Sequence, residues 1–535
     1  MWIWPSNLID LVFRKLSISQ FPPTGVSLSL SLPVLLFTTA ASCGGQVAAL
    51  SCCEETTTGK SMKSWAPINL NVGLVVGVLF VLLTYLVLSQ QAASSGLSVA
   101  ATVAQWIMDK HLTTTNGPAE TFIASDVQRT AEEQLVQGSG EKGKVVYNTK
   151  GSYSETCEVD GDVRINSTAL SVTLVPASSS ERREWRIWPY SRKNMPDIKM
   201  VTVTQLEDKS SAPPCTVTYN IPAVLFALGG LTGNFWHDFG DVLVPLFIAS
   251  RRYDGEVQFL ISNMKPWWPA AYKTILQRLS KYDAVDLDGD GDGDAHVVRC
   301  FPHVTVGIHM HNGLSIVPEW APGPPGGRGL TMADFTRFMR EVYALPRDAP
   351  ASLVREEPGK QSPPPRLLLI HREHSRRFMN EREILQAAEA AGFEAVALDL
   401  RRDVTVDAQA RVVNSFDVLL GVHGAGLTNS VFLPPGAVLV QVVPYGKMDV
   451  IATLEFGLPA KEMGLKYLDY VVSAEESTLL EMLGPEHPAI KDPDSIHRSG
   501  WDKMTEFYLN MQDVRIDVAR FAPVLTQAFD HLRQQ

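Results

Sequence analysis

The stretch that decides the fold begins RLLLIHREHSRRFMNEREILQAAEAAG at residues 366–392. Its first five residues are a short apolar run, typical of a strand buried in a parallel sheet. Asn380 and Glu383 then have the spacing of a helix-capping box, and Gly392 marks the helix end. Further strand-like runs follow with helical patterns between them: FEAVALDL (393–400), DVLLGV (417–422) and AVLVQVVP (437–444). This alternation with short connections predicts a doubly wound, Rossmann-like half.

A second, less regular α/β half is expected before this one. Residues 221–300 mix strand-like runs such as VQFLI (257–261) with helical ones. Segments rich in proline and glycine lie between the halves, and the run at 358–366 is the preferred boundary. We therefore predict an α/β chain of two lobes, 153–357 and 358–535, with the cleft between them as the default ligand site. A last helical stretch, 502–533, could return across both lobes.

Composition narrows the function classes. The 535 residues allow three or four structural units, and 45% apolar with 20% charged residues is an ordinary globular balance. The net charge of −11 (47 basic minus 58 acidic residues) disfavours binding nucleic acid through bulk charge. Six cysteines are too few for a disulfide scaffold. In an oxidising compartment we expect Cys157 to pair with Cys215 and Cys300 to stay free, with three buried thiols as the alternative.

One segment predicts a membrane anchor. Residues 64–108 carry no charge, and 72–88 read VGLVVGVLFVLLTYLVL, which gives a span at 68–90. Two lysines precede this segment, so the positive-inside rule leaves 1–67 in the cytosol and sends the remainder into the lumen. An over-extended translation start is one interpretation of 1–67, and no function is assigned to this region. Residues 91–152 are predicted to be a stem, and the sequon at Asn166 a luminal glycan site.

The second half carries two candidate anion-binding turns. Arg372, Arg376 and Arg377 follow the strand at 366–370, and the carboxyl end of a parallel strand is where ligands bind. The next strand leads into GVHGAGLTN (421–429), where small residues let a phosphate approach the backbone. A solvated basic turn and a packing turn are the alternatives. Glu455 is placed as a ligand of the ribose hydroxyls, on spacing alone.

The first half offers a candidate base within GNFWHDFGD (233–241). His237 with Asp238 or Asp241 could form a base and its orienting carboxylate. A tryptophan pair, Trp267 and Trp268, could stack on sugar rings. Burial in an aromatic core is the alternative for both groups.

An aspartate- and glycine-rich run, DGDGDGD, occupies 288–294. Counted as an EF-hand loop, it has Arg299 at the twelfth position, where a bidentate glutamate is required. A solvated loop is favoured, so no metal site is predicted. The alternative is that a DxD pattern in this run holds a divalent ion on a nucleotide sugar.

Several long motifs in order resemble glycosyltransferase family 61. They are YNIPAVLFALGGLTGNFWHDFGDVLVPLF (219–247), GEVQFLI (255–261), LLLIHREHSRRFMNEREI (367–384) and GVHGAGLTNSVFLPPGAVLVQVVPYG (421–446). The similarity points to the plant branch of xylan-decorating arabinofuranosyl- and xylosyltransferases. It implies one Golgi span and inverting transfer without a metal. It also implies a two-lobed GT-B-like fold, with an acceptor-side lobe at 153–357 and a nucleotide-sugar lobe at 358–535. Residues 1–60 have no place in the family pattern, and the Asp/Gly run looks longer than usual.

The resemblance carries roles onto matching residues. It implies that a UDP-sugar is bound by residues from the two turns, namely Arg372, Ser375, Arg376, His423, Gly424, Ala425, Gly426, Thr428 and Asn429, to which we add Glu455. The acceptor glycan is expected at Asn234, Trp236, Trp267 and Trp268. The expected reaction moves a pentose from a UDP-pentose to xylan or a related glycan. A catalytically inactive, membrane-tethered glycan-binding protein of the same fold is the alternative.

Overall fold

The computed structural model describes residues 143–148, 153–289, 297–323, 327–350, 363–401 and 403–534. The predicted cytosolic region and span lie outside these ranges, as does nearly all of the stem. Among the described helices, none combines the length and apolar character needed to cross a membrane. Residues 144–148, placed in the stem by the sequence, form a strand paired with a strand of the first lobe. The folded lobe therefore begins before residue 153.

The first lobe contains a ten-stranded mixed sheet whose main order is β4-β5-β3-β2-β10-β7-β8-β9, with β1 paired to β2 and β6 to β10. The strands are β1 (Lys144–Asn148), β2 (Thr156–Asn166), β3 (Ser171–Val175), β4 (Arg183–Ile187), β5 (Val201–Gln205), β6 (Val217–Thr218), β7 (Ala223–Ala227), β8 (Gln258–Ser262), β9 (Val285–Asp286) and β10 (Val298–Val306). The run β10-β7-β8-β9 is parallel, whereas β2 is antiparallel to β1, β3 and β10. The prediction of a Rossmann-like first lobe is therefore wrong for its antiparallel part, where strands follow one another without intervening helices.

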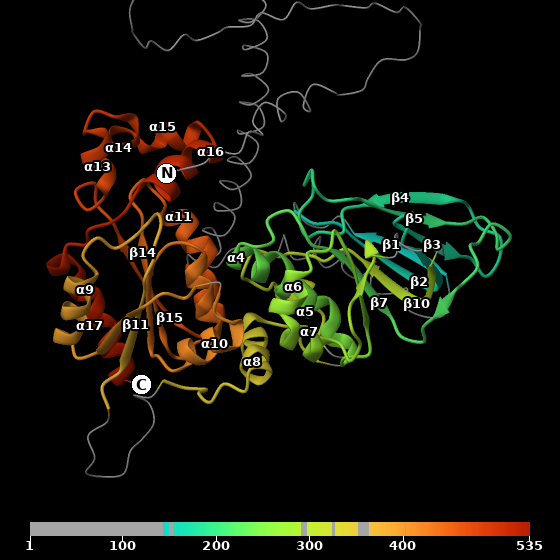
Figure 1. The fold of residues 1–535 in the computed structure, drawn as a ribbon, viewed down its shortest axis with the longest axis horizontal. Helices are drawn as coiled ribbons and strands as arrows, with labels where there is room; N and C mark the ends of the chain where they lie inside the picture. The colour runs from blue at the N-terminus through green and yellow to red at the C-terminus, as the bar shows by residue number, and fades with distance from the viewer. Residues whose placement is uncertain are drawn as a thin grey trace, which may run out of the picture. The chain divides into compact units, whose positions relative to one another are not determined.

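Helices cover the parallel part of this sheet (Figure 1). They are α4 (Phe235–His237), the π-helix η1 (Asp238–Leu243), α5 (Val244–Ser250), α6 (Trp267–Ala271), α7 (Lys273–Leu279) and α8 (Met332–Val342). Apolar residues of β7 and β8, such as Phe226 and Phe259, share one buried cluster with residues of these helices. The α4–η1 segment follows the carboxyl end of β7, so that strand positions the predicted base.

The second lobe is the predicted parallel sheet, in the order β12-β11-β13-β14-β15 with every pairing parallel. Its strands are β11 (Arg366–Ile370), β12 (Glu394–Leu398), β13 (Val418–Val422), β14 (Val438–Val443) and β15 (Lys466–Val471). Its main helical segments are α9 (Glu381–Ala390), α10 (Val406–Asn414), the 3-10 helix η6 (Ala425–Phe432), α11 (Asp449–Ala452), the π-helix η7 (Thr453–Gly457), α12 (Leu458–Glu462) and α17 (Val518–Gln534).

Both faces of the second sheet are buried, which explains its continuous apolar strands. On β11, Leu367 and Leu369 join the cluster that includes α9 and α17, and Leu368 and Ile370 join the cluster that includes α10. Figure 1 shows α9 and α17 on one side of this sheet and α10 on the other. The expectation that the last helix returns across both lobes is wrong. A shorter helix, α17, packs mainly on α9, β14 and β15.

The two lobes share buried apolar residues. The rings of Phe239 in η1 and Phe432 in η6 meet edge to face, with centroids 6.0 Å apart. Both belong to a single core cluster, and α4 also packs against η6. The segment carrying the predicted base is thus fixed directly against the glycine-rich turn of the second lobe.

The cysteine prediction is wrong. Cys215 pairs with Cys300, with Cα atoms 5.9 Å apart, and Cys157 is free and fully buried on β2. Pairing of β6 with β10 sets Val217 opposite Arg299, which draws the two neighbouring cysteines together. That pairing is a long-range contact, so sequence spacing gave no sign of it.

Candidate active site

The predicted arginine turn and the predicted glycine turn meet. The strands β11 and β13 are neighbours in the sheet, so their carboxyl ends open at the same edge. The Nη1 atom of Arg376 donates to the carbonyl of His423 at 2.7 Å. A Cβ added to Gly424 would lie 2.7 Å from Nη1 of Arg376 and 3.1 Å from Nη1 of Arg372. We call Arg372, Arg376, His423 and Gly424 the cationic corner.

Local backbone geometry and hydrogen bonds orient Arg372 and Arg376. Arg376 has a positive φ of 62°, and its N–H donates to the carbonyl of Gln512 at 2.7 Å. The Nε of Arg372 donates to the carbonyl of Ser375 at 3.0 Å, which closes the loop on itself. Arg377 instead forms an exposed ion pair with Asp513 at 2.6 Å. Of the three predicted arginines, two therefore enter the corner and one does not.

The corner holds positive charge without a matching carboxylate. Within the described residues, neither Arg372 nor Arg376 has a carboxylate oxygen within 4.0 Å, and Nε of Arg376 is buried without a partner. Burial and the like charge of Arg372 lower the pKa of Arg376, while Glu455 opposes this shift. Burial also lowers the pKa of Arg372. Arginine remains charged in proteins, so the corner suits an anion.

His423 is held as a neutral hydrogen-bond donor. The residue is 2% exposed, and Nε2 of Gln441 donates to its Nδ1 at 2.7 Å. The hydroxyl of Tyr467 donates to Oε1 of the same glutamine at 2.8 Å. Burial, with the nearby Arg376 and Arg372, lowers the pKa of His423 to about 3. Its Nε2 therefore carries the proton, and this atom lies 3.5 Å from Oε2 of Glu455.

Glu455 borders the cationic corner from η7. Its side chain keeps 30% of its surface exposed, so a ligand can reach it. Burial of the remainder raises the pKa of Glu455 to about 7, against the opposing charges of Arg376 and Arg192. A carboxyl with this pKa is partly protonated near neutral pH.

The rest of the glycine turn forms the start of η6. Gly424 has φ of 145°, a region that favours glycine. Ala425 and Gly426 remain half-buried at the corner. The side chains of Thr428 and Asn429 are buried instead, and Oγ1 of Thr428 and Oδ1 of Asn429 have no hydrogen-bond partner among the described residues. Only the first residues of this turn present backbone to a ligand at the surface.

In the first lobe, Asp241 rather than Asp238 contacts His237. Oδ2 of Asp241 lies 2.9 Å from Nδ1 of His237, which leaves Nε2 of the imidazole to accept a proton. Arg192 makes a two-pronged pair with Asp241 at 2.7 and 2.8 Å, and Tyr190 donates to it at 2.8 Å. Burial raises the pKa of Asp241, but hydrogen bonds from His237 and Arg192 outweigh it and keep that pKa low. We call these four residues the base cluster.

Asp238 and Trp268 belong to the core, so their predicted roles are wrong. Asp238 is 3% exposed and accepts hydrogen bonds from the Gly233 backbone, the indole of Trp268 and the hydroxyl of Tyr272. Trp268 is fully buried and has no surface for a sugar.

The remaining predicted acceptor residues lie near His237. Asn234 caps α4 by accepting from the N–H of Trp236 at 3.0 Å. The Trp236 ring meets the His237 ring edge to face, with centroids 4.8 Å apart. Trp267 is 49% exposed, and its ring would lie 3.6 Å from a Cβ added to Gly233. Asn234 and Trp236 thus belong to the segment that carries the predicted base, and Trp267 lies beside Gly233 at its start.

The base cluster acts electrostatically on Glu455, which lies at the edge of the cationic corner. The charge of Arg192 acts on the pKa of Glu455, although the two residues belong to different lobes. Packing of α4 against η6 brings the two lobes together at this point. Sequence reasoning missed Arg192, Gln441 and Tyr467, because each takes its place through long-range contacts. The only local signal was a polar glutamine inside an otherwise apolar strand.

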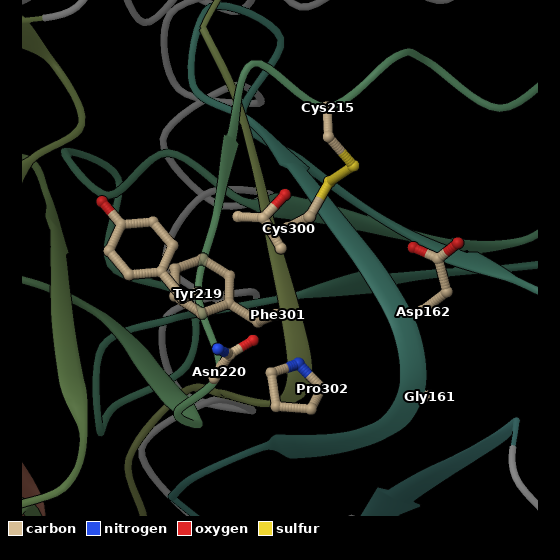
Figure 2. A pocket seen from close by; sticks show the side chains of 9 residues that line it. Gly161, Asp162, Cys215, Tyr219, Asn220, Cys300, Phe301 and Pro302 are labelled. Atoms are coloured by element: carbon tan, nitrogen blue, oxygen red, sulfur yellow. A yellow bond between two sulfur atoms is a disulfide. The ribbon is translucent and has the colours of Figure 1, made fainter.

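A separate hollow of about 350 Å³ lies in the first lobe beside the disulfide (Figure 2). Tyr219 and Phe301 stack there with ring centroids 4.5 Å apart, and Asp162 stands on the other side of the disulfide. None of the predicted catalytic or sugar-binding residues lines it.

Two other predicted positions are described. Asn166 ends β2, and its side chain accepts from the N–H of Ala169 in the following turn. Asp288, the first aspartate of the Asp/Gly run, pairs with Lys199 and accepts from the N–H of Met264. Most of that run lies outside the described residues.

Comparison with known proteins identifies the chain's relatives. A family model described as Glycosyltransferase 61 matches residues 235–440. The chain is 42% identical over 400 residues to a β-1,2-xylosyltransferase of Oryza sativa subsp. japonica, covering 71% of this chain and 83% of that one. It is 41% identical over 412 residues to an α-1,3-arabinosyltransferase of the same plant, covering 76% and 69%. A xylan glycosyltransferase of Arabidopsis thaliana is 33% identical over 438 residues, covering 77% and 86%. With a long match that runs from α4 to β14 and includes both turns of the site, the chain belongs to glycosyltransferase family 61 and is a glycosyltransferase.

Proposed function

We propose that this enzyme transfers a pentose, arabinofuranose or xylose, from a UDP-sugar to a xylan backbone or similar glycan, with inversion at the sugar carbon. The relatives named above are xylosyl- and arabinosyltransferases. In this proposal the two lobes form a GT-B-like pair, with the donor on the second lobe and the acceptor on the first.

The reaction is a direct displacement. An acceptor hydroxyl oxygen forms a bond to C1 of the sugar while the bond from C1 to the diphosphate oxygen breaks, and its electron pair leaves on UDP. The hydroxyl proton passes to Nε2 of His237, whose Nδ1–H is held by Asp241. Arg372, Arg376 and the backbone at 424–426 stabilise the charge that builds on the diphosphate. Because these groups are fixed before the reaction, they do not reorganise when the charge develops.

The observation that carries this proposal is the uncompensated cationic corner. Two guanidinium groups pack against Gly424, where a Cβ would meet both, and no carboxylate oxygen lies within 4.0 Å of either one within the described residues. Buried cations are normally paired, so an unpaired couple favours a ligand that brings its own negative charge. A diphosphate supplies that charge.

Two arginines could take the place that a divalent ion has in other sugar-nucleotide enzymes, so we propose a reaction that needs no metal. Transfer should then persist in EDTA. Loss of transfer in EDTA, restored by Mn²⁺ or Mg²⁺, would favour the metal-dependent alternative.

We further propose a single-pass, type II placement in the Golgi membrane with the catalytic part in the lumen. The apolar segment at 68–90 and the sequon at Asn166 favour this placement. The disulfide between Cys215 and Cys300 also fits an oxidising compartment. Protease protection of the luminal part in intact vesicles, with an Asn166→Gln mobility shift, tests it.

The full chain, assayed with UDP-xylose or UDP-arabinofuranose and a xylo-oligosaccharide, is expected to release UDP and give a pentosylated product. Its anomeric configuration, read by NMR, should be opposite to that of the donor. Arg372→Ala should abolish transfer without unfolding the protein, while Arg377→Ala should leave transfer unchanged, because that side chain pairs with Asp513 outside the corner. Near wild-type turnover in Arg372→Ala would contradict the proposed role of the corner.

A further inference from the structure

The carboxyl group of Glu455 lies beside hydrogen-bond donors of the candidate active site. The π-helix η7 places it at the edge of the cationic corner, and the ring of Tyr467 would lie 3.0 Å from a Cβ added to the nearby Gly457. Its Oε2 atom is 3.5 Å from Nε2 of His423. Its own five-residue segment, TLEFG, contains no other charged residue.

A series of hydrogen-bonded side chains determines that Nε2 of His423, the atom facing Glu455, carries the proton. Tyr467 on β15 donates to Gln441 on β14, and Gln441 donates to Nδ1 of His423. Because Nδ1 accepts a hydrogen bond, Nε2 must carry the proton of the neutral ring. Both Gln441 and His423 are buried, so water does not compete for these bonds.

Three charged or titratable groups from other elements act near Glu455. They are Arg376 from the loop after β11, Arg192 from the segment after β4, and His423 at the end of β13. The two arginines favour the carboxylate form, while burial favours the acid and prevails, with a pKa of about 7. A carboxyl group whose pKa lies near neutral pH can change its protonation state when a further charge binds beside it.

We propose that Glu455 takes up one proton from solvent when the donor's diphosphate binds in the cationic corner, and that Gln441 and Tyr467 are positioning residues for this step. The inference rests on the proposed function, since it needs the diphosphate at Arg372 and Arg376. A diphosphate there adds negative charge beside the carboxylate and offsets the attraction of Arg376. The neutral acid then donates through its O–H to a phosphate oxygen, while its other oxygen accepts from Nε2 of His423. No bond other than the O–H bond forms, and the proton stays on Glu455.

Calorimetry of the full chain with UDP-xylose, without acceptor, tests the proton uptake. Titration in buffers of different ionisation enthalpy gives the number of protons bound with the ligand, and the phosphodiester groups of UDP-xylose do not titrate in this range. We expect uptake approaching one proton at pH 8 and little at pH 5.5. Affinity should weaken by up to about tenfold for each pH unit above pH 7, because one proton is linked to binding.

Glu455→Gln removes the titration but keeps the hydrogen-bonding shape. Its binding should lose the proton uptake and become nearly independent of pH, with higher affinity than wild type at pH 8.5. Loss of affinity at every pH would overturn the proposal and favour a ribose-binding carboxylate. Binding by the wild type without proton uptake would also overturn it, while leaving the proposed function intact. Failure to bind either UDP-pentose would instead overturn the proposed function, and this inference with it.

Tyr467→Phe tests the positioning chain. Without the hydroxyl, Gln441 is freer and Nε2 of His423, 3.5 Å from Oε2 of Glu455, is no longer fixed as a donor directed at the ionised carboxylate, so the pH window of proton uptake should move upward. Tyr445→Phe is the matched control, because its hydroxyl donates to the Ile490 carbonyl. An unchanged window in Tyr467→Phe, or an equal shift in the control, would contradict the positioning role.

Discussion

The base cluster and the cationic corner both contain buried or partly buried arginine, but the arginines have opposite roles in the two. In the first lobe, Arg192 is bound at both prongs by buried Asp241, so its guanidinium is paired with a carboxylate inside the protein. In the second lobe, Arg372 and Arg376 lie beside a glycine and each other, and no carboxylate is within 4.0 Å in the described residues. An arginine paired with a carboxylate stabilises the folded protein, whereas two arginines without a carboxylate partner attract an anionic substrate. Loss of the first should cost stability, and loss of the second should cost activity.

The largest expected effect separates activity from stability in the cationic corner. The double variant Arg372→Met, Arg376→Met should lower kcat/KM for the donor by about 10³ or more, since removal of one preorganised donor alone costs about 10² to 10³. Its unfolding temperature should be unchanged or higher, because two like charges have left a partly buried site. Steady-state kinetics and thermal unfolding measure both. A clear fall in unfolding temperature would show that these arginines support the fold after all.

The reverse result is expected in the base cluster. Arg192→Met leaves the Asp241 carboxylate buried without its cation, which should lower the free energy of unfolding by about 3 kcal/mol. Urea unfolding measures this change. Arg183→Met is the control, because Arg183 pairs with Glu181 on the surface and should contribute at most about 0.5 kcal/mol. Equal effects of the two variants would remove the distinction between the clusters.

A smaller change tests the access to the corner without altering its charge. A Cβ in Gly424→Ala would meet both guanidinium groups, so the donor KM should rise by about tenfold, with a stability cost of about 1 to 2 kcal/mol from the positive φ. Gly484→Ala carries a similar backbone cost at φ of 79° but has nothing within 4 Å of its Cβ. If both variants have the same KM, the space above Gly424 is not used by the donor.

The last expected effect is a pH dependence of stability. The folded pKa of Glu455, about 7, lies above the ordinary glutamate value, so the folded protein binds an extra proton between about pH 4.5 and pH 7. Stability is therefore lost as pH rises through this window. Glu455→Gln should be more stable than wild type at pH 8 and equal to it at pH 4.5, by urea unfolding. Glu389→Gln on the exposed face of α9 is the control and should show no such difference.

The second lobe could be predicted from its sequence because its signals are local. The apolar runs around Leu368 and Leu419 have the length and composition of strands buried on both faces, and Gly392 ends the helix between them. The meeting of the two turns also followed from the sheet, since the carboxyl ends of neighbouring parallel strands share one edge.

The antiparallel part of the first lobe and the internal order of the base cluster could not be predicted in this way. Arg192 is 49 residues from Asp241, and only the fold brings them together. The choice between Asp238 and Asp241 depended on which face of a π-helix turns toward His237, and that helix departs from the regular period. The cysteine pairing was wrong for the same reason, because Cys215 and Cys300 are 85 residues apart.

That cross-link has a practical consequence for making the protein. The loop it closes contains His237 and Asp241, and closing a loop of about 85 residues restricts the unfolded chain by about 4 to 5 kcal/mol. A recombinant chain produced in the reducing cytosol of a bacterium would lack this contribution and would be prone to aggregate or to be degraded. Secretion through the endoplasmic reticulum of a eukaryotic host is therefore the appropriate route to active material.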